Sequence, residues 1–189
     1  MKILIGCEYS GIVSQAFKSK GHDVTSCDLL DSELSHDRSH YKGNIFDIVP
    51  GSFDMLIAFP PCTYLAKSQF HLHSSPGRKE ETIKAVKFVD DLWKLDIEMI
   101  AIENPIGYLN KNWLPPSQIT NCCNYGSIYG KEICLWLKNL PPLIDTYVSA
   151  GKKKVSNHIN SRMSQADKSK IKSRFFPEMA EAMATQWNF

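Results

Sequence analysis

The sequence predicts an α/β fold with a doubly wound, mostly parallel sheet, on three observations. Short apolar runs alternate along the chain with amphipathic stretches, which is typical of parallel strands joined by crossover helices. Hydrophobic residues make up 43% of the 189 residues and charged residues 22%, which excludes a disordered chain. The longest apolar runs hold about five residues, whereas a membrane span needs roughly 18.

The first half of the chain supplies three predicted strands, at residues 2–6, 23–28 and 54–58. Residues 12–17 have the apolar spacing of a helix, and the polar residues 30–42 are predicted to form a loop. The third strand is broken by two prolines, which cannot continue a central strand.

The second half supplies a predicted helix at 79–95, a buried strand at 99–102 and a last strand at 133–137. A short terminal helix opens at Pro177. Neither an internal repeat nor a long linker is visible, so we expect residues 1–189 to form a single domain.

Six cysteines occur without any CxxC spacing, and most lie in or beside apolar runs. A reduced, intracellular protein therefore fits better than a disulfide framework. The apolar stretch at the start, residues 1–5, is too short for a signal peptide, so we expect a cytoplasmic location.

Charge is concentrated near the end of the chain. Residues 151–174 contain eight basic residues and one acidic residue, a net charge of +7, while residues 1–150 have a net charge of −3. Such a run is either a solvated loop or a strip that contacts the phosphates of a nucleic acid.

Polar residues follow four predicted strands and should meet in one cleft, because ligands of doubly wound sheets bind at the carboxyl ends of the strands. These residues are Glu8-Tyr9-Ser10-Gly11, Asp28, Pro60-Pro61-Cys62 and Glu103-Asn104-Pro105. The first turn lacks the GxGxxG pattern of dinucleotide sites. Asp28 can hold a ribose diol, and Gly43-Asn44-Ile45 is either the edge of an adenine site or a plain turn.

Cys62 is presented on a turn that two prolines make rigid. It is either a nucleophile with a lowered pKa or an inert buried thiol. Glu103 follows the next strand along the chain, where it either shares a proton with a substrate or caps a turn.

Together, Phe59-Pro60-Pro61-Cys62 and Glu103-Asn104-Pro105 resemble the catalytic pair of the cytosine-C5 DNA methyltransferases. The turn at 8–11 occupies the place of their cofactor loop, and the stretches at 100–105 and 131–138 are most similar to small phage-type members. The terminal residues 176–184 resemble the closing helix of that family. A phage-encoded protein of a bacterial host would fit this resemblance.

The resemblance implies a Rossmann-like fold with an antiparallel last strand and S-adenosylmethionine as cofactor, without a metal. Cys62 would add to C6 of a flipped-out cytosine, and Glu103 would hydrogen-bond its N3 and exocyclic amine. The implied cofactor-binding residues are Glu8, Tyr9, Ser10, Gly11, Asp28, Asn44, Ile45 and Pro60. The implied substrate-binding residues are Pro61, Asn104, Pro105, Arg78, Lys131, Lys152, Lys153, Lys154, Arg162 and Arg174.

The sequence departs from this family in two respects. Its cofactor loop has fewer glycines, and only the basic stretch at 144–175 replaces a target-recognition domain of ~100 residues. Phosphate contacts should therefore dominate, with short or relaxed specificity. Two alternatives remain: the same chemistry on RNA or a free cytosine nucleotide, and a methyltransferase-like protein that binds nucleic acid without catalysis.

Overall fold

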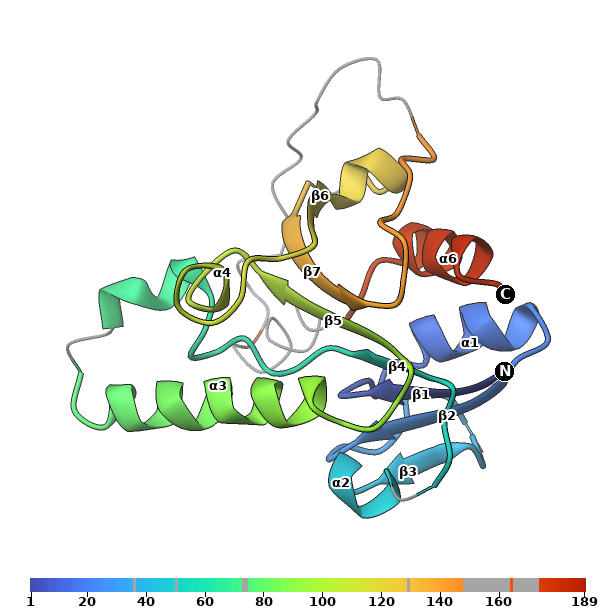
Figure 1. Cartoon of the computed structure of the whole chain (residues 1–189), viewed down its shortest axis with the longest axis horizontal. Coiled ribbons are helices and arrows are strands. Elements are labelled where there is room, and N and C mark those ends of the chain that lie inside the picture. Colours follow the sequence, from blue (N-terminus) through green and yellow to red (C-terminus); the bar gives the residue numbers. More distant parts are fainter. Residues whose placement is uncertain (36, 50, 73–74, 129, 148–163, 165–173) are drawn as a thin grey trace.

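The computed structural model describes residues 1–35, 37–49, 51–72, 75–128, 130–147, 164 and 174–189 (Figure 1). Its centre is one sheet of seven strands in the order β3-β2-β1-β4-β5-β7-β6. The strands are β1 (Lys2–Gly6), β2 (Asp23–Asp28), β3 (His40–Lys42), β4 (Met55–Ala58), β5 (Met99–Pro105), β6 (Gln118–Asn121) and β7 (Glu132–Lys138).

Strands β1 to β5 are parallel, whereas β7 pairs antiparallel with both β5 and β6. This order and direction of the strands confirm the predicted Rossmann-like, doubly wound fold with an antiparallel last strand. Ala58 pairs with Ile102, so β4 and β5 reach the same sheet edge. The residues that follow Ala58 and those that extend β5 are therefore neighbours in space.

Helices cover both faces of the sheet (Figure 1). One face carries α1 (Ile12–Ser19), α6 (Pro177–Gln186) and the 3₁₀ turn η2 (Cys122–Tyr125). The other face carries α2 (Ile45–Ile48), α3 (Arg78–Trp93) and α4 (Leu109–Asn112), and a 3₁₀ turn η1 (Lys67–Leu72) precedes α3.

Alternation along the central strands fills two separate cores. Ile3 and Ile5 pack toward α1 and α6, while Leu4 packs toward α3. Successive side chains of a strand point to opposite faces, so an all-apolar strand such as β1 serves both cores at once. This is why the central strands appear in the sequence as continuous apolar runs.

The structure corrects the predicted secondary structure at three places. The last residues of the predicted loop 30–42 form β3, which pairs with β2. β5 does not stop at Ile102 but continues to Pro105, because Glu103 and Asn104 pair with β7. The short polar strand β6 was not predicted, since it has no apolar run of its own.

All six cysteines are free thiols, as the sequence predicts. Among the residues that the structure describes, no helix is long and apolar enough to cross a bilayer.

The packing of α6 on α1 gives a test of the fold. Met183 lies in α6 with no exposed surface. Met183→Ala should lower the free energy of unfolding by about 2–5 kcal/mol, because it leaves a cavity in the core between α6 and the sheet. Thr185→Ala, at an exposed position of the same helix, should change it by less than ~0.5 kcal/mol. Denaturant unfolding measures both values, and equal effects would contradict this placement of α6.

Candidate active site

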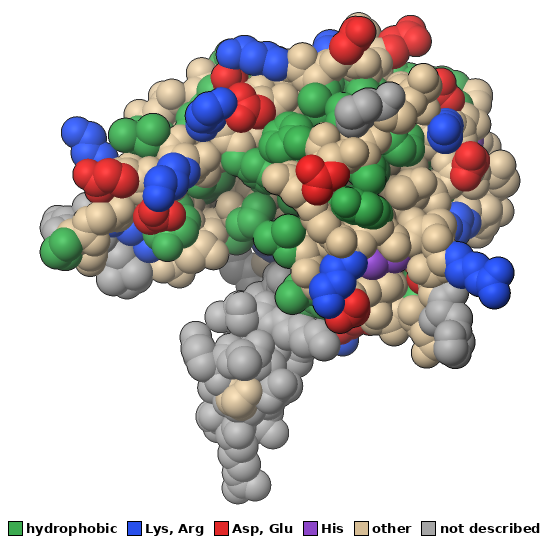
Figure 2. Space-filling view, turned by 90° about the horizontal axis from the view of Figure 1, so that it is seen from below, with side chains coloured by type: hydrophobic (Ala, Val, Ile, Leu, Met, Phe, Trp, Pro, Cys, Tyr) green, Lys and Arg blue, Asp and Glu red, His purple; other side chains and the backbone are tan. Residues whose placement is uncertain are grey.

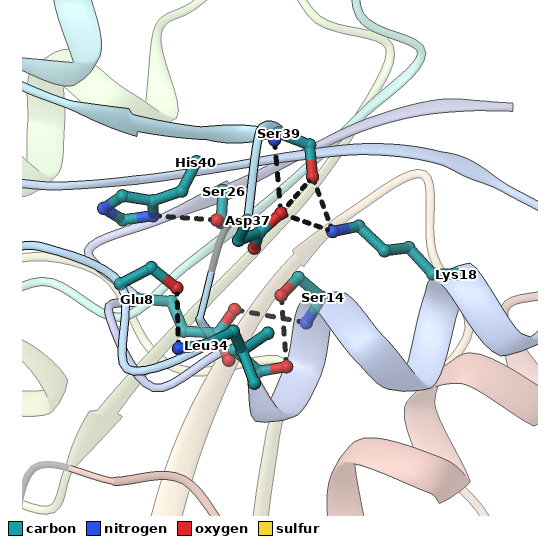
Figure 3. Close-up of polar contacts among 10 residues, drawn as sticks. Glu8, Ser14, Lys18, Ser26, Leu34, Asp37, Ser39 and His40 are labelled. Carbon is teal, nitrogen blue, oxygen red and sulfur yellow. Dashed lines mark hydrogen bonds and ion pairs between the residues drawn. The ribbon is translucent and has the colours of Figure 1, made fainter.

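Glu8 holds the first turn of α1. Its Oε1 accepts the Val13 N–H at 2.6 Å, and the Ser10 hydroxyl donates to the same oxygen at 3.4 Å. Its Oε2 accepts the Ser14 N–H at 3.1 Å (Figure 3). Burial raises the pKa of Glu8, and the two backbone hydrogen bonds oppose that shift. Glu8 and Ser10, both expected to bind cofactor, are thus engaged with the free N–H groups of a helix.

Tyr9 and Gly11 connect the same turn to the loop that follows β2. The Tyr9 carbonyl accepts the Glu33 N–H at 2.8 Å. Gly11 has a φ of +76°, and a Cβ there would lie 2.3 Å from Leu34 Cδ1. A glycine is required here, because the backbone is left-handed and the loop side chain packs directly on it.

The loop after β2 is itself held by polar contacts. Asp37 accepts hydrogen bonds from Lys18 Nζ at 3.1 Å and Ser39 Oγ at 2.6 Å (Figure 3). Ser26 and His40 form a further side-chain hydrogen bond of 2.9 Å between β2 and β3. The loop therefore has a defined path along the sheet edge.

A cavity of about 380 Å³ lies at the carboxyl ends of β1, β2 and β4. Four predicted ligand residues line it: Asp28, Asn44, Ile45 and Pro61. Glu8, Tyr9, Ser10, Gly11 and Pro60, which were also expected to bind cofactor, are not among its lining residues. Figure 2 shows hydrophobic side chains gathered in the middle of the face formed by α2 and α3, with charged side chains around them.

The cavity combines apolar walls with the Asp28 carboxylate at the end of β2 and with the ion pair of Glu81 and Lys84 on α3, whose atoms lie 2.7 Å apart. Leu29, Ala85 and Phe88 contribute apolar surface, and Asp28 contributes a half-buried carboxylate. Burial, with a contribution from Asp28, raises the pKa of Cys7 to about 12 and that of Cys27 to about 11, so both lining thiols are neutral. Such a lining suits a nucleoside, whose base is flat and apolar and whose ribose carries two hydroxyls.

The turn from Pro60 to Cys62 leaves β4 beside this cavity. Asn104 Nδ2 donates to the Pro60 carbonyl at 2.9 Å, which ties the turn to β5. The Cys62 carbonyl accepts the N–H groups of Leu65 and Ala66 at 3.0 and 2.9 Å, and Cys62 as a whole residue is exposed although its thiol is partly desolvated. The thiol is therefore presented on an ordered turn, as the sequence predicts.

Glu103 and Lys131 form an ion pair next to that turn. Glu103 Oε1 lies 3.6 Å from Lys131 Nζ, and Glu103 is 7% exposed. Lys131 directly precedes β7, whose antiparallel pairing with β5 brings its start beside the end of β5. Glu103 raises the pKa of Lys131, and Phe176 lies under the ammonium group at 5.9 Å.

Cys62 belongs to the same electrostatic group. Desolvation raises the pKa of its thiol, Lys131 opposes that rise, and Glu103 adds to it. A neutral thiol, a carboxylate and an ammonium group thus share one sheet edge. This set can supply a nucleophile, a hydrogen-bonding carboxylate and a positive charge that favours the thiolate.

Arg78 has a different place from the one expected. It is buried at the start of α3, where Nη2 donates to the Thr63 carbonyl at 2.7 Å and the guanidinium lies 4.6 Å from the Tyr64 ring centroid. It therefore contacts the turn that follows Cys62 and is not presented to a substrate.

Of the basic stretch 151–174, the structure describes only Ser164 and Arg174. Arg174 Nη2 lies 2.9 Å from Glu33 Oε1, and the next residue, Phe175, packs on Phe59 with ring centroids 4.7 Å apart and the rings tilted by 49°. The expected phosphate contacts Lys152, Lys153, Lys154 and Arg162 lie outside the described residues.

Sequence reasoning missed Tyr64 and Phe88, which line the cavity together with Glu81, Lys84 and Ala85 from α3. Phe88 lies three residues beyond Ala85, which is one turn along the helix. This second apolar face of the predicted helix is the sequence pattern that could have identified Phe88 as a cavity residue.

Comparison with known proteins gives limited similarity. No family model matches the chain, and no curated protein matches it. A prophage-encoded E. coli protein, provisionally assigned as a DNA modification methyltransferase, has a TM-score of 0.48 and 16% identity, over 72% of this chain and 46% of that one. The bifunctional kinase-methyltransferase WbdD has a TM-score of 0.44 and 14% identity, over 77% and 36%. The chain thus spans less than half the length of either structure.

Removal of the Glu8 carboxylate tests its role at α1. Glu8→Ala should lower the free energy of unfolding by about 1.5–3 kcal/mol, because the Val13 and Ser14 N–H groups lose a charged acceptor. The pKa of Glu8 is raised in the folded protein, so the folded state binds its proton more tightly than the unfolded state. The advantage of the wild type over Glu8→Ala should therefore grow as pH falls from neutrality toward the ordinary value of 4.5. Denaturant unfolding across this range measures the difference, and a smaller advantage at acid pH would contradict it.

Proposed function

We propose that this protein transfers a methyl group from S-adenosylmethionine to C5 of cytosine in DNA, through a covalent bond between Cys62 and C6 of the base. One observation carries the proposal. Cys62, Glu103 and Lys131 share one sheet edge, beside a cavity of about 380 Å³ that contains Asp28. Nucleophile, carboxylate and nucleoside-sized cavity are the three parts that this reaction needs.

The cavity residues fit the cofactor. The Asp28 carboxylate can accept hydrogen bonds from the ribose hydroxyls, and Ile45 and Phe88 can pack against the adenine. When bound, the cofactor supplies an electrophilic methyl group. Pro61 lines the cavity and directly precedes Cys62, so a donor in the cavity is next to the nucleophile's turn.

Cys62 begins the reaction as a neutral thiol, because desolvation raises its pKa. Loss of its proton gives a thiolate, which the Lys131 ammonium stabilises. The thiolate forms a bond to C6 and makes C5 nucleophilic. The C5 proton leaves after methylation, and the bond between sulfur and C6 breaks to restore the thiolate.

Glu103 stabilises the base while charge develops on it. Its Oε1 is buried and has no hydrogen-bond partner among the described residues, so it can accept the exocyclic amine N–H of cytosine, while a protonated carboxyl group can donate to N3. The Lys131 ammonium group lies 3.6 Å from this same oxygen and holds the carboxylate in place. Carboxylate and ammonium together fix the orientation of the base over Cys62.

The stretch at 151–174 carries a net charge of +7, which favours a polyanion over a free nucleotide, and the resemblance to DNA methyltransferases favours DNA among the polyanions. A free nucleotide would not need such a stretch. A base of duplex DNA would be flipped out to reach Cys62, at a cost of a few kcal/mol in lost stacking.

Methyl transfer from labelled S-adenosylmethionine to duplex DNA, single-stranded DNA, RNA and dCMP tests the proposal. Nucleoside analysis should find 5-methylcytosine in duplex DNA. Cys62→Ser should abolish it, because the hydroxyl is a far poorer nucleophile, and Glu103→Gln should slow it by at least ~10²-fold. Cys123→Ser, a half-buried thiol that does not line the cavity, is the matched control and should retain activity.

A duplex that contains 5-fluorocytosine should trap the adduct, because fluorine at C5 cannot leave as a proton. Mass spectrometry should then locate the base on Cys62. A modified base other than 5-methylcytosine, or an adduct on another cysteine, would overturn the assignment. If 5-methylcytosine forms only in RNA or dCMP, the proposed reaction is retained and DNA is no longer its substrate.

The cofactor assignment has its own test. Asp28→Ala should weaken the binding of S-adenosylhomocysteine by about 1.5–3 kcal/mol, since a charged hydrogen bond to the ribose is lost. Calorimetry without DNA measures this. Asp31→Ala is the control, because the Asp31 carboxylate is exposed and pairs with Lys42 at 2.8 Å. Equal affinity of the Asp28 variant and the wild type would remove Asp28 from the site.

A further inference from the structure

The turn that follows Cys62 is clamped from the side of β5. Tyr108 N–H donates to the Leu65 carbonyl at 2.7 Å, and Lys67 N–H donates to the Ile106 carbonyl at 3.0 Å. A Cβ at Gly107 would lie 1.9 Å from the Leu65 oxygen, so the two backbones are in direct contact. This side of the clamp is built from main chain and is rigid.

Arg78 clamps the same turn from the side of α3. Its guanidinium donates to the carbonyl of Thr63, the residue next to Cys62, and packs over the ring of Tyr64. Thr82, one turn further along α3, donates to the Arg78 carbonyl at 2.9 Å and contacts the Tyr64 carbonyl at 3.5 Å. The planar guanidinium stacks over the ring while it donates the hydrogen bond, a geometry that the compact ammonium group of lysine does not reproduce.

The clamp by Arg78 joins two sites. Tyr64 lines the cavity, and α3, which begins at Arg78, contributes Glu81, Lys84, Ala85 and Phe88 to the same wall. Cys62 lies two residues before Tyr64, on the far end of the same turn. A ligand that presses on Tyr64 or α3 therefore acts on the contacts that hold the main chain beside the nucleophile.

We propose that Arg78 is a positioning residue that couples occupancy of the cavity to the placement and reactivity of Cys62. The identity of the ligand rests on the proposed function, but the clamp does not. A cavity ligand fixes Tyr64, Arg78 passes that constraint to the Thr63 carbonyl, and the Cys62 thiol is held in one position. Because coupling between sites is reciprocal, a group attached to Cys62 should also change the affinity of the cavity for its ligand.

Alkylation of the native protein by iodoacetamide measures the reactivity of Cys62, with peptide mass mapping to separate it from the other five thiols. S-adenosylhomocysteine should slow alkylation of Cys62 in the wild type by at least about fivefold. In Arg78→Lys the slowing should fall below about twofold while calorimetry still detects binding. Lys79→Ala, an exposed cation on the next residue of α3, should behave as the wild type.

Simple shielding of the thiol by the ligand does not depend on Arg78, so equal slowing in the wild type and Arg78→Lys would overturn the coupling. Unchanged alkylation in a wild type that binds the ligand would also overturn it. If S-adenosylhomocysteine does not bind the wild type, the cofactor assignment and the coupling both fail. The alkylation rate without ligand then tests only whether Arg78 positions Cys62. This rate should differ between Arg78→Lys and Lys79→Ala, and equal rates would show that Arg78 does not position Cys62.

Discussion

The parallel pairing of β4 with β5 is the constraint on which the site depends. It brings the turn after Ala58 and the end of β5 to one sheet edge, although Pro60 and Asn104 are 44 residues apart in the chain. The hydrogen bond from Asn104 to the Pro60 carbonyl then fixes the position of this turn relative to the end of β5. Cys62 and Glu103 each extend from one side of this junction, so a shift in strand register would separate nucleophile and carboxylate.

The antiparallel strand β7 adds the positive charge. A parallel strand in the same position would place its beginning at the opposite sheet edge, far from Glu103. Because β7 runs the other way, Lys131 enters beside the end of β5 and pairs with Glu103. Phe176, just before α6, packs on the same ammonium group, so the terminal helix also borders the site.

Two kinds of acidic residue occur at the carboxyl ends of the strands, and hydrogen bonding distinguishes their tasks. Glu8 is buried with both oxygens bound to the first turn of α1, so it stabilises the fold. Glu103 is also buried but keeps one oxygen without a hydrogen-bond partner among the described residues, and Asp28 lines the cavity. A carboxylate with open acceptor positions is the one suited to a ligand.

The sequence by itself determined the central strands, the two helical layers and the turn that presents Cys62, because apolar runs and paired prolines act locally. It also placed Asp28 and Glu103 at the ends of predicted strands. Only the tertiary structure decided which of these groups remain open: Glu8 binds backbone N–H groups of α1, Arg78 donates to the Thr63 carbonyl, and Lys131 meets Glu103 through strand order. Such pairings depend on which elements are adjacent in space, and residue spacing along the chain carries no record of that adjacency.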